Sequence, residues 1–147
     1  MDGRARRGAR REGEGLTATD HALELARVAV AAAADKKARD IVVLDVSDQL
    51  VITDCFVIVT AANERQGQAI VEAVEEKLRE RDVKPTRREG TRASDWMLLD
   101  YQDVVVHVQQ PEARANFRLE HLWKDCPPVE FPEARVAAGA DVEDDSW

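Results

Sequence analysis

Two apolar, β-branched runs of strand length stand close together in the first half of the chain, and they constrain the fold more than any other feature. They are DIVVLDVS (residues 40–47) and DCFVIVTA (residues 54–61), separated by a short connection that contains Asp48 and Gln49. Val and Ile fit the pleated surface of a sheet, and unbroken apolar runs are typical of strands covered on both faces. We therefore expect two adjacent, buried strands.

Helical patterns flank these two strands. Before them, Thr17 and Asp20 form a capping-box pattern ahead of an apolar stripe with helical spacing that is expected to end near residues 36–37. After them, Asn63 and Gln66 provide a second cap in front of a second amphipathic helix. The first half of the chain thus predicts the order helix, strand, strand, helix.

The second half of the chain predicts three more strands and a last helix. Residues 84–90 (KPTRREG) are polar and contain a proline, which suits a strand at the edge of a sheet. Residues 96–102 and 103–109 form two strand segments, and Pro111 opens a helix whose apolar stripe ends at Trp123. The pattern predicts an α+β (α/β-like) domain with a mixed sheet of about five strands and flanking helices.

Length and charge divide the chain into three parts. The 147 residues, 44% of them hydrophobic, suit a single domain, which we place at residues 17–123. Residues 1–16 carry five Arg against three acidic residues (5 − 3 = +2) and four glycines, and are expected to form a flexible Arg-rich arm. Residues 124–147 carry two basic against seven acidic residues (2 − 7 = −5) and are expected to form a disordered acidic tail.

The overall charge of −8 argues against a protein whose main contact is with nucleic-acid phosphates. No aromatic residue is interleaved with the arginines of the arm, so bases have nothing to stack on, and we expect no sequence-specific nucleic-acid binding. Cys55 and Cys126 are the only cysteines and have no zinc-type spacing, and no apolar run reaches the length of a membrane span. These features predict a reduced, cytoplasmic protein without a membrane anchor.

An enzymatic function depends on carboxylates near the ends of the predicted strands, which could hold Mg²⁺ ions for nucleotidyl transfer. No glycine-rich phosphate-binding turn accompanies them, and neither GxxxxGK[ST] nor GxGxxG is present. We therefore interpret them as solvated turn residues, and predict no catalytic residue, no metal and no cofactor. The carboxylates in question are Asp45, Asp48, Asp54, Asp100 and Asp103.

His107 is a second catalytic candidate, because it is the group in the predicted sheet that titrates near neutral pH. Strand alternation puts it on a half-polar face with Val105 and Gln109. No Ser or Cys nucleophile stands at a recognisable spacing from it, so we predict a hydrogen-bonded structural histidine.

Aromatic residues make up only 5% of the chain, yet four of them fall within residues 95–123. Trp96 begins a strand after a polar loop and is surrounded in sequence by Asp95, Asp100 and Asp103. An aromatic centre ringed by carboxylates suits a basic protein surface, although a core position for Trp96 is equally compatible with the pattern. The four aromatic residues are Trp96, Tyr101, Phe117 and Trp123.

Several motifs occur together in an order that resembles the ribosomal silencing factor (Iojap-like) family over residues 17–123. They are DIVVLDV, TDCF, an Arg-Gln pair, DWMLLDYQDVVVHV and LEHLW. The resemblance implies a sheet similar to that of nucleotidyltransferases but without their catalytic constellation. It also implies a translational repressor that binds the large ribosomal subunit through ribosomal protein L14 and sterically blocks joining with the small subunit.

The resemblance further implies a partner-binding site, which we carry over to Trp96, Met97, Asp100, Tyr101 and Asp103. The apolar residues Met97 and Leu99 are compatible with a homodimer of the free protein. Three hypotheses remain: a ribosomal anti-association factor, a metal-dependent nucleotidyltransferase, and a dimeric adaptor for another basic protein.

Overall fold

The structure, a computed structural model, describes residues 16–90 and 94–134. Five strands form one mixed sheet in the order β1-β2-β5-β4-β3, where β2 runs parallel to β5 and the other neighbours are antiparallel. The strands are β1 (Arg39–Asp45), β2 (Cys55–Thr60), β3 (Arg87–Glu89), β4 (Trp96–Asp100) and β5 (Val104–Gln109). This arrangement confirms the predicted mixed sheet of five strands, including the edge position of residues 84–90.

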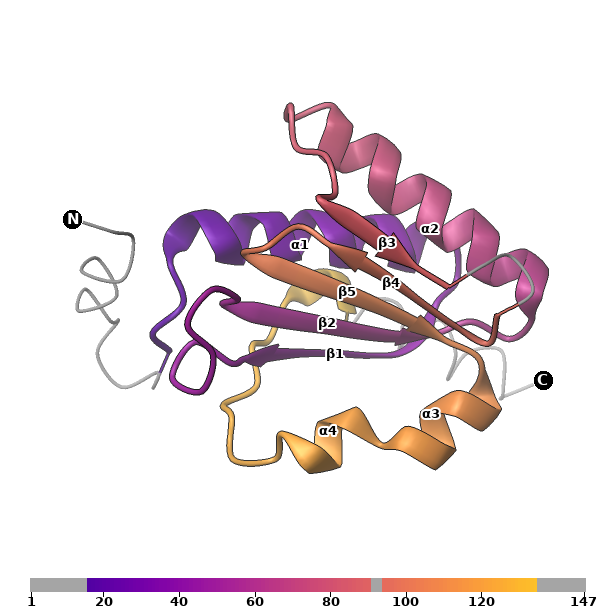
Figure 1. The fold of residues 1–147 in the computed structure, drawn as a ribbon. Helices are drawn as coiled ribbons and strands as arrows, with labels where there is room; N and C mark the ends of the chain where they lie inside the picture. Colours follow the sequence, from indigo (N-terminus) through magenta and orange to yellow (C-terminus); the bar gives the residue numbers. More distant parts are fainter. Residues whose placement is uncertain (1–15, 91–93, 135–147) are drawn as a thin grey trace.

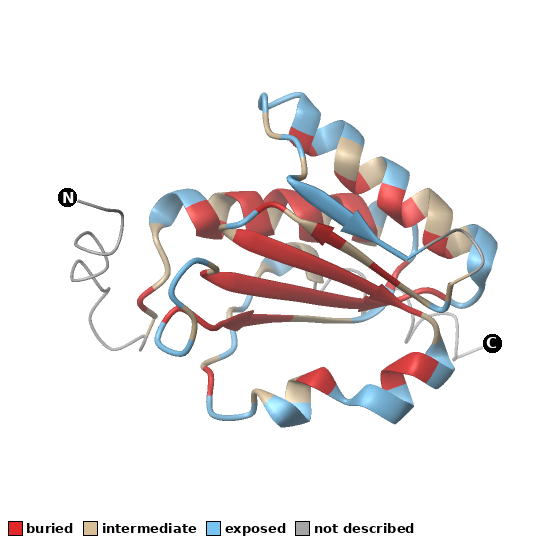
Figure 2. Cartoon of the chain, viewed as in Figure 1, coloured by how far each residue is buried: buried red, intermediate tan, exposed pale blue. Residues whose placement is uncertain are grey.

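Helices cover both faces of the sheet (Figure 1). Helices α1 and α2 lie on one face, and the shorter α3 and α4 lie on the other. Every residue of β2 and β5 is buried as a result (Figure 2), in agreement with the continuous apolar run of β2. Strand β5 is buried on both faces although it also contains His107 and Gln109. The helices are α1 (Asp20–Asp35), α2 (Glu64–Arg79), α3 (Pro111–Phe117) and α4 (Leu119–Leu122).

The two long helices begin at side-chain caps. The Asn63 side chain accepts a hydrogen bond from the backbone N–H of Gln66 at 2.8 Å, as predicted for α2. Helix α1 starts two residues later than its sequence pattern suggests, because Thr19 is the N-cap and accepts from the N–H of Ala22 at 3.1 Å. Thr17 donates its own backbone N–H to Asp45 at 2.7 Å and so fastens the chain before α1 to the sheet.

The last predicted helix is divided into two. Arg118 adopts a left-handed conformation (φ 48°) and separates α3 from α4, so the apolar stripe that ends at Trp123 does not belong to one continuous helix. A non-glycine residue in this region is uncommon, and periodicity does not reveal it.

Each face of the sheet has its own apolar core. On the α1–α2 side, Val57, Val106 and Leu99 pack beneath helix residues such as Ile70 and Val74. On the α3–α4 side, the core contains Leu44, Val46, Phe56, Ile58, Val105, Leu119 and Cys126. The second core is smaller, because two short helices cover less of the sheet than two long ones.

Residues 124–134 are the part of the predicted acidic tail that the structure describes, and they are packed against the sheet rather than disordered. The backbone N–H of Val129 donates to the carbonyl of Val43 at 2.8 Å, and the N–H of Asp45 donates to the carbonyl of Pro127 at 2.9 Å. Phe131 continues onto the core beneath α1. The edge of β1 is thereby paired, which alternating hydrophobicity alone does not predict.

The remainder of the tail (residues 135–147) and residues 1–15 of the predicted arm lie outside the described residues. None of the helices in the described part of the chain has the length and apolar character needed to span a membrane.

Candidate partner-binding face

Strand alternation on β4 divides the predicted partner-binding residues between the two faces of the sheet. Trp96 and Leu98 pack toward the α3–α4 side, whereas Met97, Leu99 and Tyr101 belong to the core beneath α1 and α2. The five residues predicted to bind the partner therefore do not share one face of the sheet. A one-residue step along a strand reverses the face on which a side chain lies.

Met97 and Tyr101 are each only 6% exposed, so neither offers a contact surface to a partner. The terminal methyl of Met97 lies 3.2 Å from the position that a β-carbon would take on Gly67 of α2. Leu99 is fully buried, and a homodimer through Met97 and Leu99 would require the core to open.

On the α3–α4 side, five rings follow one another across the sheet, and we call them the aromatic row. Successive ring centroids lie 4.6 Å (Phe117–Trp96), 5.9 Å (Trp96–His107), 5.0 Å (His107–Phe56) and 5.3 Å (Phe56–Trp123) apart. Both contacts of Phe56 are edge-on, a favourable arrangement for aromatic rings. The row joins residues of β2, β4 and β5 to α3 and to the end of α4.

His107 holds the centre of the aromatic row. Its Nδ1 accepts a hydrogen bond from Nε1 of Trp96 at 3.2 Å, which confirms the predicted structural histidine. Burial lowers the pKa of His107 to about 4, so the ring is neutral at physiological pH. The imidazole therefore accepts the indole hydrogen of Trp96 and orients that side chain.

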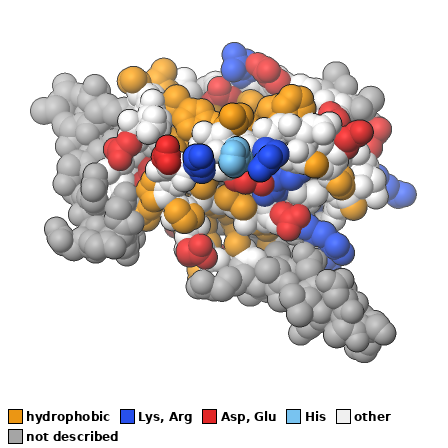
Figure 3. Space-filling model, turned by 90° about the horizontal axis from the view of Figure 1, so that it is seen from below, with side chains coloured by type: hydrophobic (Ala, Val, Ile, Leu, Met, Phe, Trp, Pro, Cys, Tyr) orange, Lys and Arg blue, Asp and Glu red, His pale blue; other side chains and the backbone are white. Residues whose placement is uncertain are grey.

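The row reaches the surface at Phe117, which is half-exposed, while Leu122 of α4 is 70% exposed. Figure 3 views this face directly and shows hydrophobic side chains at the surface beside Lys or Arg side chains and a histidine. All four of the large hydrophobic side chains that are most exposed in the described part of the chain belong to α3, α4 or the β1–β2 connection; they are Val51, Ile52, Phe117 and Leu122. Exposed apolar surface of this kind is typical of protein-binding sites.

Asp100 and Asp103, the two predicted acidic residues, lie at the turn between β4 and β5. Asp100 accepts the backbone N–H of Gln102 at 2.8 Å and lies 3.7 Å from Arg87, with a quarter of its side chain exposed. Asp103 is 46% exposed and lies 4.0 Å from His21. Asp103 is thus more available to a partner, while Asp100 also shapes the turn.

Arg114 is a site residue that the sequence pattern does not reveal. It is 9% exposed, donates from Nη1 to the Thr60 hydroxyl at 2.7 Å, and its Nε lies 3.1 Å from Glu120. This pair of contacts fastens α3 to β2 and α4 to α3. The half-exposed Phe117 is held in place by these polar contacts as well as by Trp96.

Two of the carboxylates considered for metal binding have a structural role instead. Asp45 and Asp54 are each 1% exposed, which corrects their interpretation as solvated turn residues. Asp45 accepts the N–H groups of Thr17, Ala18 and Ser47, and Asp54 accepts that of Thr19. Within residues 16–90 and 94–134, no group of three His, Cys, Asp or Glu side chains is placed to hold a metal ion.

The fold and this face define an α+β domain with a row of aromatic side chains that reaches the surface at Phe117, and with two exposed or partly exposed carboxylates at the opposite end of β4. Residues 19–146 match the family model described as ribosomal silencing factor during starvation. The chain belongs to the ribosomal silencing factor family.

Relatives and a solved structure agree with this assignment. The ribosomal silencing factor of Halalkalibacterium halodurans is 40% identical over 108 residues, which cover 74% of this chain and 92% of that protein. A mouse protein named mitochondrial assembly of ribosomal large subunit protein 1 is 34% identical over 60% of this chain and 40% of its own length. A crystal structure from Bacillus halodurans superposes with a TM-score of 0.66 at 38% identity, covering 74% of this chain and 99% of that one.

Proposed function

We propose that this protein represses translation by binding the large ribosomal subunit through ribosomal protein L14 and by sterically blocking the joining of the small subunit. The proposal is supported by membership of the ribosomal silencing factor family. The names of its relatives refer to ribosome silencing and to assembly of the large subunit.

The observation that carries the proposal is the combination of Trp96 and Phe117 with the acidic turn of Asp100 and Asp103. Trp96 is half-buried and its indole is oriented by His107, so its surface is offered in one fixed conformation. A rigid aromatic anchor loses little conformational entropy on binding and is a frequent hot spot in interfaces. The carboxylates at the other end of β4 are suited to Lys and Arg side chains of a basic ribosomal protein.

In this proposal the protein represses translation simply by occupying the joining face of the large subunit. A protein bound at the joining face excludes the small subunit by overlap, so it consumes no substrate and requires no cofactor. The action is that of a cytoplasmic repressor whose effect depends on its amount and affinity. Nucleotides and Mg²⁺ are expected to leave the protein's affinity for the large subunit unchanged.

The proposal is tested with purified ribosomal subunits in sucrose gradients. The protein is expected to sediment with the large subunit, to be absent from joined ribosomes, and to lower the joined fraction as its concentration rises. Cosedimentation with the small subunit alone, or inhibition that depends strictly on a nucleotide, would contradict the proposal.

A further inference from the structure

A groove lies between α1 and α2. These two helices cover the opposite face of the sheet from α3 and α4 (Figure 1), and the aromatic row lies on the α3–α4 side. The groove has a volume of about 690 Å³, room for several side chains. Its floor is apolar, and its small side chains leave space for a second layer of helix packing. The floor consists of Val28, Ala31 and Ala32 from α1 and Ala69 and Ala73 from α2.

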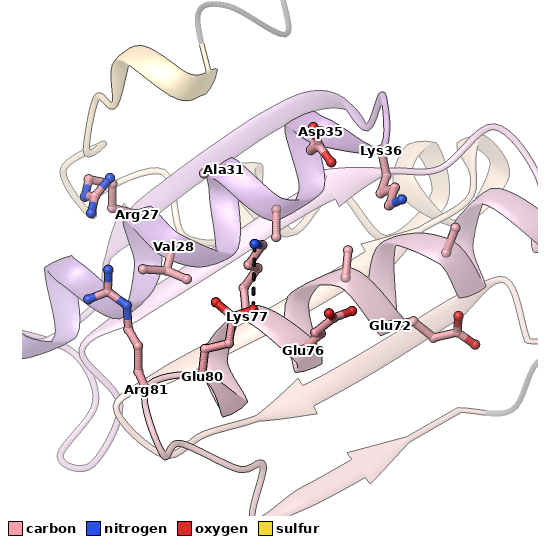
Figure 4. Close-up of a pocket in the computed structure, with 13 residues that line it drawn as sticks. Arg27, Val28, Ala31, Asp35, Lys36, Glu72, Glu76, Lys77, Glu80 and Arg81 are labelled. Carbon is pink, nitrogen blue, oxygen red and sulfur yellow. Dashed lines mark ion pairs between the residues drawn. The ribbon is translucent and has the colours of Figure 1, made fainter.

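The two ends of the groove differ in how their charges are satisfied. At the Arg27 end, Arg27 pairs with Glu24 (2.6 Å) and Glu133 (3.0 Å), and Arg81 pairs with Glu24 at 2.9 Å. Lys77 likewise lies 3.8 Å from Glu80, the pair marked by a dashed line in Figure 4. The cations at this end are therefore already neutralised within the protein.

At the other end, carboxylates remain without cations. Figure 4 shows Asp35 and Lys36, at the C-terminal end of α1, across the groove from Glu72 and Glu76 on α2. Among the described residues, none of the three carboxylates has an ion-pair partner, and Glu72 accepts only the Gln68 amide at 3.1 Å. Three carboxylates against Lys36 leave a net charge of −2 at this end.

We propose that the α1–α2 groove docks an amphipathic helix of a partner protein, with apolar side chains on the Val28–Ala73 floor and Lys or Arg facing Glu72 and Glu76. These two glutamates are four residues apart on α2, so their spacing of about 5–6 Å matches cations four residues apart on a helix lying alongside. The floor between Arg27 and Asp35 is about 12 Å long, enough for two turns of such a helix. Because the groove and the aromatic row lie on opposite faces, both partners fit at the same time.

A synthetic helix tests the groove directly. The probe is a peptide of about 18 residues with a Leu/Ala stripe flanked by lysines four residues apart, and the matched peptide carries Glu at those lysine positions. Fluorescence anisotropy with the full-length protein is expected to show binding of the lysine peptide alone. Equal binding of both peptides, or binding of neither, would overturn the proposal.

Substitutions in the groove and on the opposite face test whether the lysine peptide binds in the groove. Glu76→Lys is expected to weaken the lysine peptide about tenfold, and Ala73→Leu, which fills the floor, is expected to weaken it similarly. Glu112→Lys on α3 makes the same charge change on the other face and should leave affinity unchanged. Circular dichroism checks that each variant is folded, and an unchanged affinity in folded Glu76→Lys would contradict the docking.

Two other occupants give different results. If a second copy of the chain occupies the groove, sedimentation of the protein alone will show a dimer, and Glu76→Lys will dissociate it. If the Arg-rich arm occupies the groove, deletion of residues 1–15 will tighten binding of the lysine peptide severalfold. Either result would overturn the partner-helix assignment. Sedimentation of Glu76→Lys with the large ribosomal subunit should remain normal, so the groove and the ribosome proposal succeed or fail separately.

Discussion

The indole Nε1 of Trp96 donates its hydrogen to Nδ1 of His107 across the β4–β5 pair, 3.2 Å apart. This bond requires an unprotonated Nδ1 and fixes the tautomer of the imidazole. It connects the buried centre of the sheet to the aromatic surface that we propose as the ribosome contact. Protonation of His107 should therefore lower the stability of the fold and also change the position of the Trp96 indole.

Stability should fall in mild acid because of His107. Its folded-state pKa of about 4 lies below the ordinary 6.5, so the unfolded chain takes up the proton first as pH falls. The stabilising contribution of the neutral ring is complete above pH 6.5 and is lost as pH falls to 4, amounting to about 3 kcal/mol. Urea unfolding of the protein and of His107→Gln across this range measures the difference, and parallel pH profiles would refute the assignment.

Gln109 is fully buried, and neither polar atom of its amide has a hydrogen-bond partner among the described residues. An unsatisfied buried amide destabilises a fold, and an apolar side chain of similar size removes that cost. Gln109→Leu should therefore increase the free energy of unfolding by about 1 kcal/mol. Thermal unfolding provides the measurement, with Gln110→Leu at the neighbouring, more exposed position as control. A lower melting temperature for Gln109→Leu would show that the amide is satisfied in solution.

Two truncations, one after and one before the segment that pairs with β1 (residues 126–134), should differ in stability. The composition of the acidic tail alone gives no reason to expect this difference. A chain of residues 16–134 keeps the contacts of Val129 and Pro127 with β1 and should inhibit subunit joining as the full chain does. Ending the chain at residue 125 removes these bonds and uncovers apolar surface, at a cost of about 2–4 kcal/mol in stability. Equal denaturation midpoints for the two truncations would contradict the role of this segment.

Much of the fold is predictable from local patterns in the sequence. Where the structure differs from the prediction, the difference has an identifiable physical cause. The runs around Val43 and Val57 and the caps before α2 are short-range signals, and the structure reproduces them. The break at Arg118 and the pairing of Val129 with β1 depend on tertiary contacts that no local pattern contains. Such contacts override propensity and periodicity.

The candidate site was predictable in part. Trp96 and Asp103 emerge from composition and resemblance, and the structure leaves both accessible. Met97 and Tyr101 belong to the same stretch of residues 95–103, but the alternation of side chains along the strand places them in the core on the α1–α2 side of the sheet. Phe117 could not be predicted as a site residue, because its contact with Trp96 depends on where α3 lies against the sheet. That position is fixed by the hydrogen bond from Arg114 of α3 to Thr60 of β2.

Charge reversal at the acidic turn should change the kinetics of binding more than the fold. Asp103→Lys is expected to slow association with the large subunit and to reduce its salt dependence, because exposed charges steer a basic partner mainly before contact. Asp103 is preferable to Asp100 for this test, since Asp100 also accepts the Gln102 N–H within the turn. Stopped-flow association at two salt concentrations provides the rates, with Glu64→Lys on α2 as control. Identical rates for Asp103→Lys and the unmodified protein would remove this residue from the contact.

Sedimentation of Trp96→Ala with purified large subunits, measured alongside its melting temperature, tests whether Trp96 is the anchor of the proposed ribosome contact. Trp96 is half-buried against Phe117 and His107, so the melting temperature should fall by a few degrees while the protein stays folded at the assay temperature. Binding to the large subunit should weaken by on the order of 2 kcal/mol or more, with a corresponding loss of inhibition of subunit joining. If Trp96→Ala is folded, sediments with the large subunit and blocks joining as well as the unmodified protein does, Trp96 is not the anchor of the ribosome contact.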